Sequence, residues 1–177
     1  MVKINVGHIP EDGLNLHFDK DGEWFRNVLT EEEKTELSLE RADVICFVKK
    51  LKETIFIEGN IETIITTACS RCLEVTGFPI KSSFRYTLIP AERQLKEEQE
   101  LSSEDLEYSC YENDVIDLDA MLFEQIMLQI PMRVLCKETC KGLCPHCGKD
   151  LNATSCDCRT EFVDERLAVL KKLKKEE

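Results

Sequence analysis

The sequence lacks an apolar run that approaches the roughly 20 residues needed to cross a bilayer. Its first ten residues contain no basic start, no apolar stretch and no small-residue cleavage site, so they do not resemble a signal peptide. These two absences predict a cytoplasmic protein that has no contact with a membrane.

Positive charge and aromatic side chains are also scarce. The chain has 23 lysine and arginine residues against 35 aspartate and glutamate residues, and aromatic residues make up 7% of it. Twelve of the acidic residues, with only two basic ones, lie between residues 91 and 124. The net charge of −12 therefore describes mainly one segment. We interpret residues 91–114 as a solvated acidic insertion and assign it no function.

The motifs of three common enzyme classes are missing. The sequence has no nucleophile elbow, no phosphate-binding loop and no dinucleotide-binding fingerprint. Asp117 and Asp119 offer carboxylates for a magnesium-dependent nuclease, but helix capping explains them more simply. Glu112 and Asp114 form a second acidic pair that could be proposed for such a site, and exposure to solvent explains them more simply. We therefore expect a non-catalytic protein without a small-molecule substrate, and a metal-dependent RNA-processing enzyme remains the alternative hypothesis.

The segments that are present up to residue 90 are mostly of the β type. Apolar residues alternate with polar ones, or β-branched residues cluster, in five segments: Val2–Val6, Leu14–Phe18, Ala42–Leu51, Thr54–Thr67 and Val75–Ile89. Gly59 and Asn60 interrupt the fourth segment and predict a hairpin turn or a bulge. The pattern predicts an α+β protein with an antiparallel β-rich body, either a sheet or a small barrel.

Three segments predict helices. The clearest is Asp117–Ile130, where Asp117 caps the first turn, Pro131 ends the helix, and apolar residues recur every four positions. Weaker patterns predict a helix start at Thr30 and a second helix over Asp164–Lys175. We expect residues 1–130 to form the body, including the acidic insertion 91–114 and the helix 117–130, and residues 131–177 to form a cysteine-rich tail that ends in a helix.

Cysteine is the residue type that carries chemistry here. Six of the ten cysteines lie between Cys136 and Cys158, and two more form the sequence Cys69-Ser-Arg-Cys72. Because disulfides are rare in a reducing compartment, clustered cysteines there usually bind metal or perform redox chemistry. Cys46 and Cys110 stand alone, and we interpret both as ordinary small apolar residues.

The tail contains a zinc-binding pattern. In Cys144-Pro-His-Cys147-Gly148 the two-residue spacer lets both sulfur atoms reach one ion, and the glycine permits the turn that follows. Cys156 and Cys158 complete a tetrahedron of thiolates. Such a closed site is structural rather than catalytic. A thiol redox sensor is the alternative hypothesis, but a redox-active pair does not account for six cysteines in one short segment.

The remaining cysteines predict a second zinc ion. Cys69 and Cys72 supply two ligands, and Cys136 and Cys140 supply the two others that zinc needs. In this hypothesis the first ion joins the tail to the β-rich body. A different partition, in which Cys140 joins Cys144 and Cys147, remains open.

The chain resembles the YceD family, whose members are called large ribosomal RNA subunit accumulation proteins. The resemblance covers about residues 40–158 and rests on these sequences: Cys69-Ser-Arg-Cys72-Leu73, Ile116-Asp117-Leu118, Ile130-Pro131, Lys141-Gly-Leu-Cys-Pro-His-Cys-Gly148 and Asp150-Leu-Asn152.

The resemblance implies a bacterial protein of ribosome biogenesis and no catalytic activity. It also implies a partner, which is ribosomal RNA, a large-subunit ribosomal protein or an assembly factor. Basic residues around the cysteines are the candidates for contact with that partner: Arg71, Arg133, Lys137 and Lys141.

Overall fold

The computed structural model describes residues 2–91 and 108–158. Within these ranges the chain forms β1 (Lys3–Asn5), η1 (Val6–His8), β2 (Leu14–Asp21), α1 (Gly22–Val28), α2 (Glu33–Glu36), β3 (Ser38–Leu51), β4 (Thr54–Ala68), β5 (Val75–Pro90), β6 (Tyr108–Tyr111), β7 (Val115–Asp117) and α4 (Leu118–Gln129). No described helix is long and apolar enough to span a membrane.

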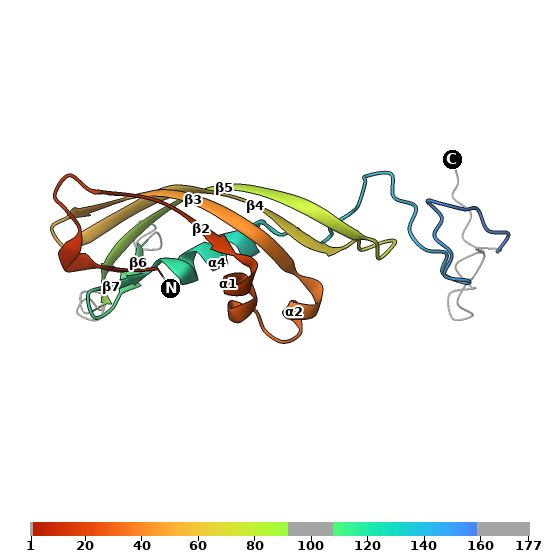
Figure 1. Ribbon diagram of the computed structural model, residues 1–177, viewed down its shortest axis with the longest axis horizontal. Helices are drawn as coiled ribbons and strands as arrows, with labels where there is room; N and C mark the ends of the chain where they lie inside the picture. Colours follow the sequence, from red (N-terminus) through yellow and green to blue (C-terminus); the bar gives the residue numbers. More distant parts are fainter. Residues whose placement is uncertain (1, 92–107, 159–177) are drawn as a thin grey trace, which may run out of the picture.

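The fold is α+β, as predicted. Five strands form one sheet in the order β2-β3-β4-β5-β6, and β1 pairs with β7 in a separate two-stranded sheet. All pairs are antiparallel except β5 with β6, which is parallel. The larger sheet is open, with β2 and β6 at its edges, so the barrel alternative does not apply. It is long and curved, and the helices lie on one side of it (Figure 1).

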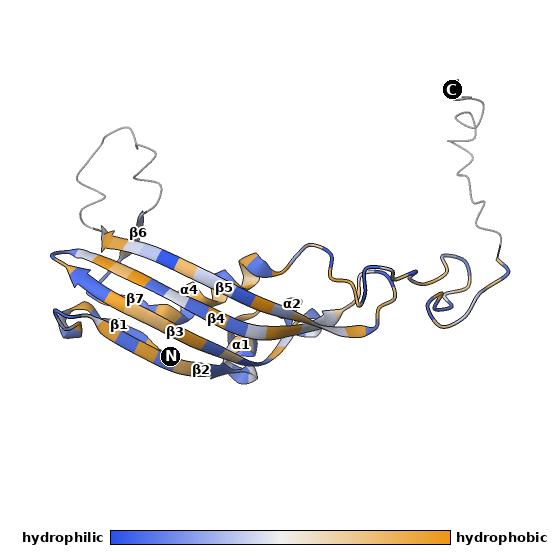
Figure 2. Ribbon diagram, turned by 90° about the horizontal axis from the view of Figure 1, so that it is seen from above, coloured by the Kyte–Doolittle hydropathy of each residue, from blue (hydrophilic) through white to orange (hydrophobic). Residues whose placement is uncertain are grey.

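Alternation along the strands separates the two faces of the sheet (Figure 2). Ile55, Ile57, Ile61 and Ile65 of β4 are fully buried on the face that carries the helices. The residues between them are mostly polar and face outward, as expected for a sheet that is solvated on one side. The core therefore lies in a single layer between the sheet and the elements that cover this face, which are α4, α1 and the small sheet of β1 and β7.

The predicted turn or bulge at Gly59 is wrong. Gly59 lies within β4 and pairs with Cys46 of β3 and Phe84 of β5 without a shift in register. A Cβ atom there would lie 2.5 Å from the carbonyl oxygen of Ile45 and 2.7 Å from the Phe84 ring. Glycine is present because neighbouring groups approach its backbone closely. The irregularity in the sheet falls instead in β3, between Leu39 and Ala42.

Helix α4 covers the buried face of the sheet (Figure 1), and its boundaries agree with the prediction. The Asp117 carboxylate accepts a hydrogen bond from the backbone N–H of Ala120 at 3.2 Å, which caps the first turn. Leu118, Leu122 and Ile126 are buried in the core. The apolar face is narrower than the sequence indicates, because Leu128 is 68% exposed.

Asp119 has a stronger interaction than the expected one with the helix dipole. It lies 2.6 Å from the ammonium group of Lys20 on edge strand β2, and both side chains are more than 90% buried. The Lys20 ammonium also lies 5.4 Å from the centre of the Trp24 ring and 5.8 Å from that of Phe18. This buried ion pair joins the start of α4 to an edge of the sheet.

Part of the predicted acidic insertion is ordered structure. Residues 108–111 form β6, and the Tyr111 hydroxyl donates a hydrogen bond to the carbonyl oxygen of Glu53 at 3.0 Å. Of the two cysteines interpreted as ordinary small apolar residues, Cys46 is buried and Cys110 is exposed. Residues 92–107 of the predicted solvated insertion lie outside the described residues.

The two weaker helix predictions have different outcomes. Thr30 precedes α2, and its backbone N–H and hydroxyl both donate to the Glu33 carboxylate, at 2.8 and 2.7 Å. The helix that follows is only one turn long. The predicted helix over Asp164–Lys175 lies outside the described residues.

Candidate metal centres

Eight cysteines gather in two groups of four within the described residues. The first group is Cys69, Cys72, Cys136 and Cys140, and the second is Cys144, Cys147, Cys156 and Cys158; within each group all sulfur atoms lie within 4.8 Å of one another. This partition is the one that the sequence analysis favoured. Either group could hold a metal ion.

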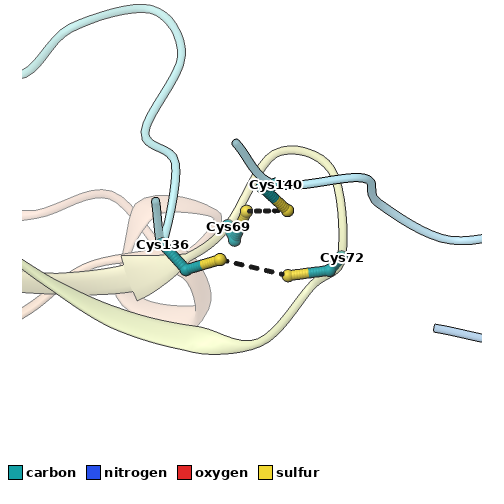
Figure 3. A group of neighbouring side chains, drawn as sticks. All are labelled: Cys69, Cys72, Cys136 and Cys140. Atoms are coloured by element: carbon teal, nitrogen blue, oxygen red, sulfur yellow. Dashed lines mark hydrogen bonds between the residues drawn. The ribbon is translucent and has the colours of Figure 1, made fainter. Parts of the chain in front are cut away.

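The first group is built on the tip of the hairpin that joins β4 to β5 (Figure 3). Cys69 follows β4 directly, and its backbone N–H donates to the carbonyl oxygen of Glu74 at 2.8 Å. The N–H of Leu73 donates back to the carbonyl oxygen of Cys69 at 2.9 Å. This tight turn requires Leu73 to adopt a left-handed conformation with φ of 61°. It brings the sulfur atoms of Cys69 and Cys72 to the same side.

The tail supplies the other half of the first group. The Cys69 and Cys140 sulfur atoms are 3.8 Å apart, and those of Cys72 and Cys136 are 3.6 Å apart (Figure 3). Four thiolates around one zinc ion at about 2.3 Å are separated by roughly 3.8 Å, so the spacing fits a tetrahedral site. Disulfide-bonded sulfur atoms would be only about 2 Å apart. The site therefore has the geometry of metal ligands rather than of disulfides.

The second group is local in the tail. The N–H of Cys144 donates to the carbonyl oxygen of Lys149 at 2.8 Å, and the N–H of Gly148 donates to that of Cys144 at 2.9 Å. Gly148 has a φ of 69°, as the sequence pattern requires. Cys144 is buried and Cys147 is exposed. This second group is therefore the more accessible of the two.

The thiol groups within each set have divergent pKa values. Backbone N–H groups of Cys72, Arg71 and Cys136 lower the pKa of Cys69 to about 6. Backbone N–H groups of Cys147 and His146 lower that of Cys144 to about 6. Burial, with hydrogen bonds from the neighbouring thiols, raises the pKa of Cys136 to about 12.

Cys158 shows the same effect in the second group. A hydrogen bond with the Cys147 thiol is the main cause and burial is the second, and together they raise the pKa of the Cys158 thiol to about 12. Four adjacent thiols cannot all ionise without a compensating cation, because each thiolate disfavours the next. A divalent ion removes this repulsion. The chemistry of the ligand set, which is soft sulfur only, favours zinc, copper(I) or iron.

Asn152 connects the two groups. It lies in the loop between Cys147 and Cys156, yet its side-chain amide donates to the sulfur of Cys140 at 3.4 Å. Its side-chain oxygen accepts from the backbone N–H of Lys141 at 2.8 Å. The carboxylate of Asp150 fixes the same amide at 2.8 Å. The loop of the second group thus orients a cysteine of the first. The sequence alone did not reveal this role of Asn152, because the contact forms only in the folded tail.

Arg71 has a structural contact that differs from its predicted role at a partner surface. Its guanidinium donates to the carbonyl oxygen of Cys140 at 2.7 Å, and its own carbonyl accepts from the N–H of Leu143 at 3.0 Å. Gly142 passes so close that a Cβ atom would lie 2.9 Å from the Arg71 carbonyl oxygen. Arg133, Lys137 and Lys141 remain exposed around the first group.

The carboxylates considered for a magnesium site have other partners. Asp117 caps α4 and lies 3.6 Å from the ammonium group of Lys3, and Asp119 is paired with Lys20. In the part of the chain that the structure describes, the two cysteine sets are the groups arranged to hold a metal. The acids therefore stabilise the fold around α4.

Replacing Asn152 with alanine should weaken metal binding at the first group while leaving its four thiols in place. Loss of a group that orients a metal ligand typically lowers affinity about 10- to 100-fold. The measurement is the zinc dissociation constant by competition with a chromogenic chelator. Asn60→Ala is the matched control, because the Asn60 side chain accepts a hydrogen bond from the Ser83 hydroxyl on the outer face of the sheet, away from both cysteine sets. Equal affinities for the two variants would contradict the assigned role.

The fold and the two cysteine sets together define a class of protein: a curved α+β sheet with a four-cysteine site at one tip and a cysteine-rich tail joined to it. The family model described as "Large ribosomal RNA subunit accumulation protein YceD" matches residues 57–174. The chain belongs to the YceD family. No solved structure matches the chain.

Two curated relatives illustrate the range of the family. The chain is 31% identical to the chloroplastic "Large ribosomal RNA subunit accumulation protein YCED homolog 1" of Arabidopsis thaliana, over 76% of this chain and 47% of the relative. It is 33% identical to YlbN of Bacillus subtilis, over 62% of this chain and 60% of the relative. The chain thus spans about half the length of the Arabidopsis relative and three fifths of YlbN.

Proposed function

We propose that the chain is a non-catalytic, zinc-binding cytoplasmic factor that supports the accumulation of large-subunit ribosomal RNA and thereby ribosome biogenesis. The observation that carries the proposal is the family match, which spans residues 57–174 and so includes both cysteine sets. The similarity to a plant protein named for the same process supports it.

Zinc is the ion proposed for both sets, two ions per chain. Sulfur separations of 3.6 and 3.8 Å suit a tetrahedral zinc–thiolate site. Each set presents four thiolates and leaves no coordination position for water or substrate. Such sites order the backbone around them. In this proposal the first ion joins the tail to the β4–β5 hairpin, and the second orders the loop that carries Asn152.

A scaffold role follows from the nature of these sites. A catalytic zinc ion needs an open position, and four thiolates make it a poor Lewis acid. The Asp117 and Asp119 side chains are occupied by capping and ion pairing, which weakens the case for a magnesium-dependent RNA-processing enzyme. The proposed partners are ribosomal RNA, a large-subunit ribosomal protein or an assembly factor.

The test is a depletion experiment in the source organism. Depleting the protein should lower large-subunit ribosomal RNA relative to small-subunit ribosomal RNA, because the proposed role concerns one subunit. Wild-type protein and the Asp117→Asn variant should both restore the ratio, whereas a variant without the first cysteine set should not. An unchanged ratio would overturn the ribosomal assignment. Failure of Asp117→Asn, as a folded protein, to restore the ratio would favour the enzyme hypothesis.

A further inference from the structure

An apolar groove lies beside the first cysteine set. One wall is α2 with the residues that flank it, and the floor is the end of β4 with the start of the hairpin turn. The other wall is formed by Ile130, Pro131 and Met132, where the chain leaves α4. The groove has a volume of about 740 Å³. We call it the hairpin groove.

Large apolar side chains in the hairpin groove face solvent. Met132 is fully exposed, Val75 is 72% exposed and Leu73 is 65% exposed. Contiguous exposed apolar side chains are uncommon on a protein surface unless they bind something. Small-molecule pockets enclose most of their ligand, and these side chains are too open for that. The groove is better suited to an extended or helical segment of another chain.

Leu73 is an unexpected residue at its position in the turn of the first cysteine set. Its left-handed conformation, with φ of 61°, is costly for a residue with a branched side chain and would cost glycine nothing. The turn nevertheless places an exposed leucine there, next to Cys72. The turn itself does not need a leucine side chain, so the exposed apolar side chain at this position favours contact with a partner.

The charge on the rim identifies the kind of partner. Residues 31–36 contain four glutamates and one lysine. Lys34 is paired with Glu31 at 2.6 Å, and Glu36 lines the groove and is exposed. This acidic wall repels the phosphates of RNA. It attracts lysine and arginine.

From these observations we propose that the hairpin groove binds a protein segment that combines apolar anchors with lysine or arginine residues. The apolar anchors would pack on Leu73, Val75 and Met132, and the basic residues would face Glu36. The proposal deepens the function given above, because it selects a basic protein rather than RNA as the partner at this surface. Peptide binding tests the groove, and the level of ribosomal RNA tests the proposed function. Because the two measurements are separate, either proposal can fail without the other.

The experiment measures the binding of labelled peptides to the zinc-loaded full chain by fluorescence anisotropy. The probe is a short peptide that alternates leucine with lysine. Comparison probes replace lysine with glutamate, or leucine with serine, and a short single-stranded RNA is a fourth probe. The leucine–lysine peptide should bind most tightly, because it alone matches both the exposed apolar side chains (Leu73, Val75 and Met132) and the acidic wall.

Two variants locate the binding. Leu73→Gly keeps the left-handed turn and removes the apolar anchor, and Glu36→Lys reverses the charge of the wall. Each should lower the affinity for the leucine–lysine peptide at least about tenfold, the scale of a significant interface residue. Each variant has a matched control. Leu128→Gln changes an equally exposed leucine on α4. Glu112→Lys changes an exposed glutamate that follows β6, at the far end of the sheet (Figure 1). Both controls should bind as the wild type does.

Metal content is measured for every protein, so that loss of the first ion is not mistaken for loss of the anchor. If Leu73→Gly loses metal, Glu36→Lys decides the matter, because it lies outside the turn. Equal peptide affinity in the wild type and Glu36→Lys would overturn the proposal. So would groove variants that lower the affinity for RNA and leave peptide binding unchanged.

Discussion

Replacing Cys69 with serine should reduce the zinc content of the purified protein from two ions per chain to about one. Cys69 is fully buried and lies within 4.8 Å of the three other sulfur atoms of its set, so no other side chain can take its place. The second set keeps its four thiols. Elemental analysis of protein made without added zinc measures the change. Cys110→Ser is the matched control, because Cys110 belongs to neither set.

The structural effect of this substitution should be large. Metal binding at structural zinc sites contributes about 10–16 kcal/mol in isolated zinc-finger peptides, and that free energy is folding free energy. Without the first ion, the hydrogen bonds from Ser70 to Val134 and from Leu143 to Arg71 should open. Hydrogen exchange at these amides should therefore accelerate in Cys69→Ser and not in Cys110→Ser. A wild-type protein that is free of metal and contains disulfides within the sets would contradict the assignment and favour a redox sensor.

Replacing Asp119 with alanine should destabilise the protein by about 3–5 kcal/mol, because removal of one partner leaves a buried charge without compensation. Lys20 and Asp119 are 2.6 Å apart, with exposed side-chain fractions of 9% and 6%. The measurement is the free energy of unfolding from denaturant titration. The destabilisation applies to the body of the protein, so the zinc content of the folded variant should not change.

Two further variants separate the charge effect from the loss of packing. The double variant Lys20→Met, Asp119→Leu should recover much of the stability, because apolar residues of similar size often replace a buried ion pair at little cost. Lys3→Met is the matched control, since Lys3 forms an exposed ion pair with Asp117 at the same end of α4. Exposed ion pairs contribute only about 0–1 kcal/mol to the free energy of unfolding, so Lys3→Met should have a small effect. A loss below about 1 kcal/mol in Asp119→Ala would contradict the assigned role.

Local patterns in the sequence predicted most of the body. Alternation identified the long strands because one face of the sheet is buried and the other is solvated, and Asp117 identified the start of α4 because an N-cap acts within one turn. The partition of the cysteines followed from the number of ligands that zinc requires. Counting favours this partition even though the two halves of the first set lie 64 and 71 residues apart, but it leaves open the partition that joins Cys140 to Cys144 and Cys147.

Features that depend on long-range contacts were missed. β6 has no alternating pattern, and its parallel pairing with β5 depends on how the chain returns to the sheet. Nothing in the sequence singles out Lys20, because only the fold brings it to Asp119. Gly59 indicated a turn, since the sequence does not reveal the approach of the Phe84 ring. The hydrogen bond from the Asn152 amide to Cys140 and the hairpin groove likewise form only when the tail has docked on the hairpin.

The two candidate metal sites differ in the length of chain that each must close when the protein folds. The second set closes a short loop from Cys144 to Cys158, whereas the first must bring Cys136 and Cys140 back to the distant hairpin that carries Cys69 and Cys72. Closing the longer loop costs more entropy and slows folding. We therefore expect the local site to capture its ion first and to present Asn152 to Cys140, so that docking of the tail is the last step of maturation.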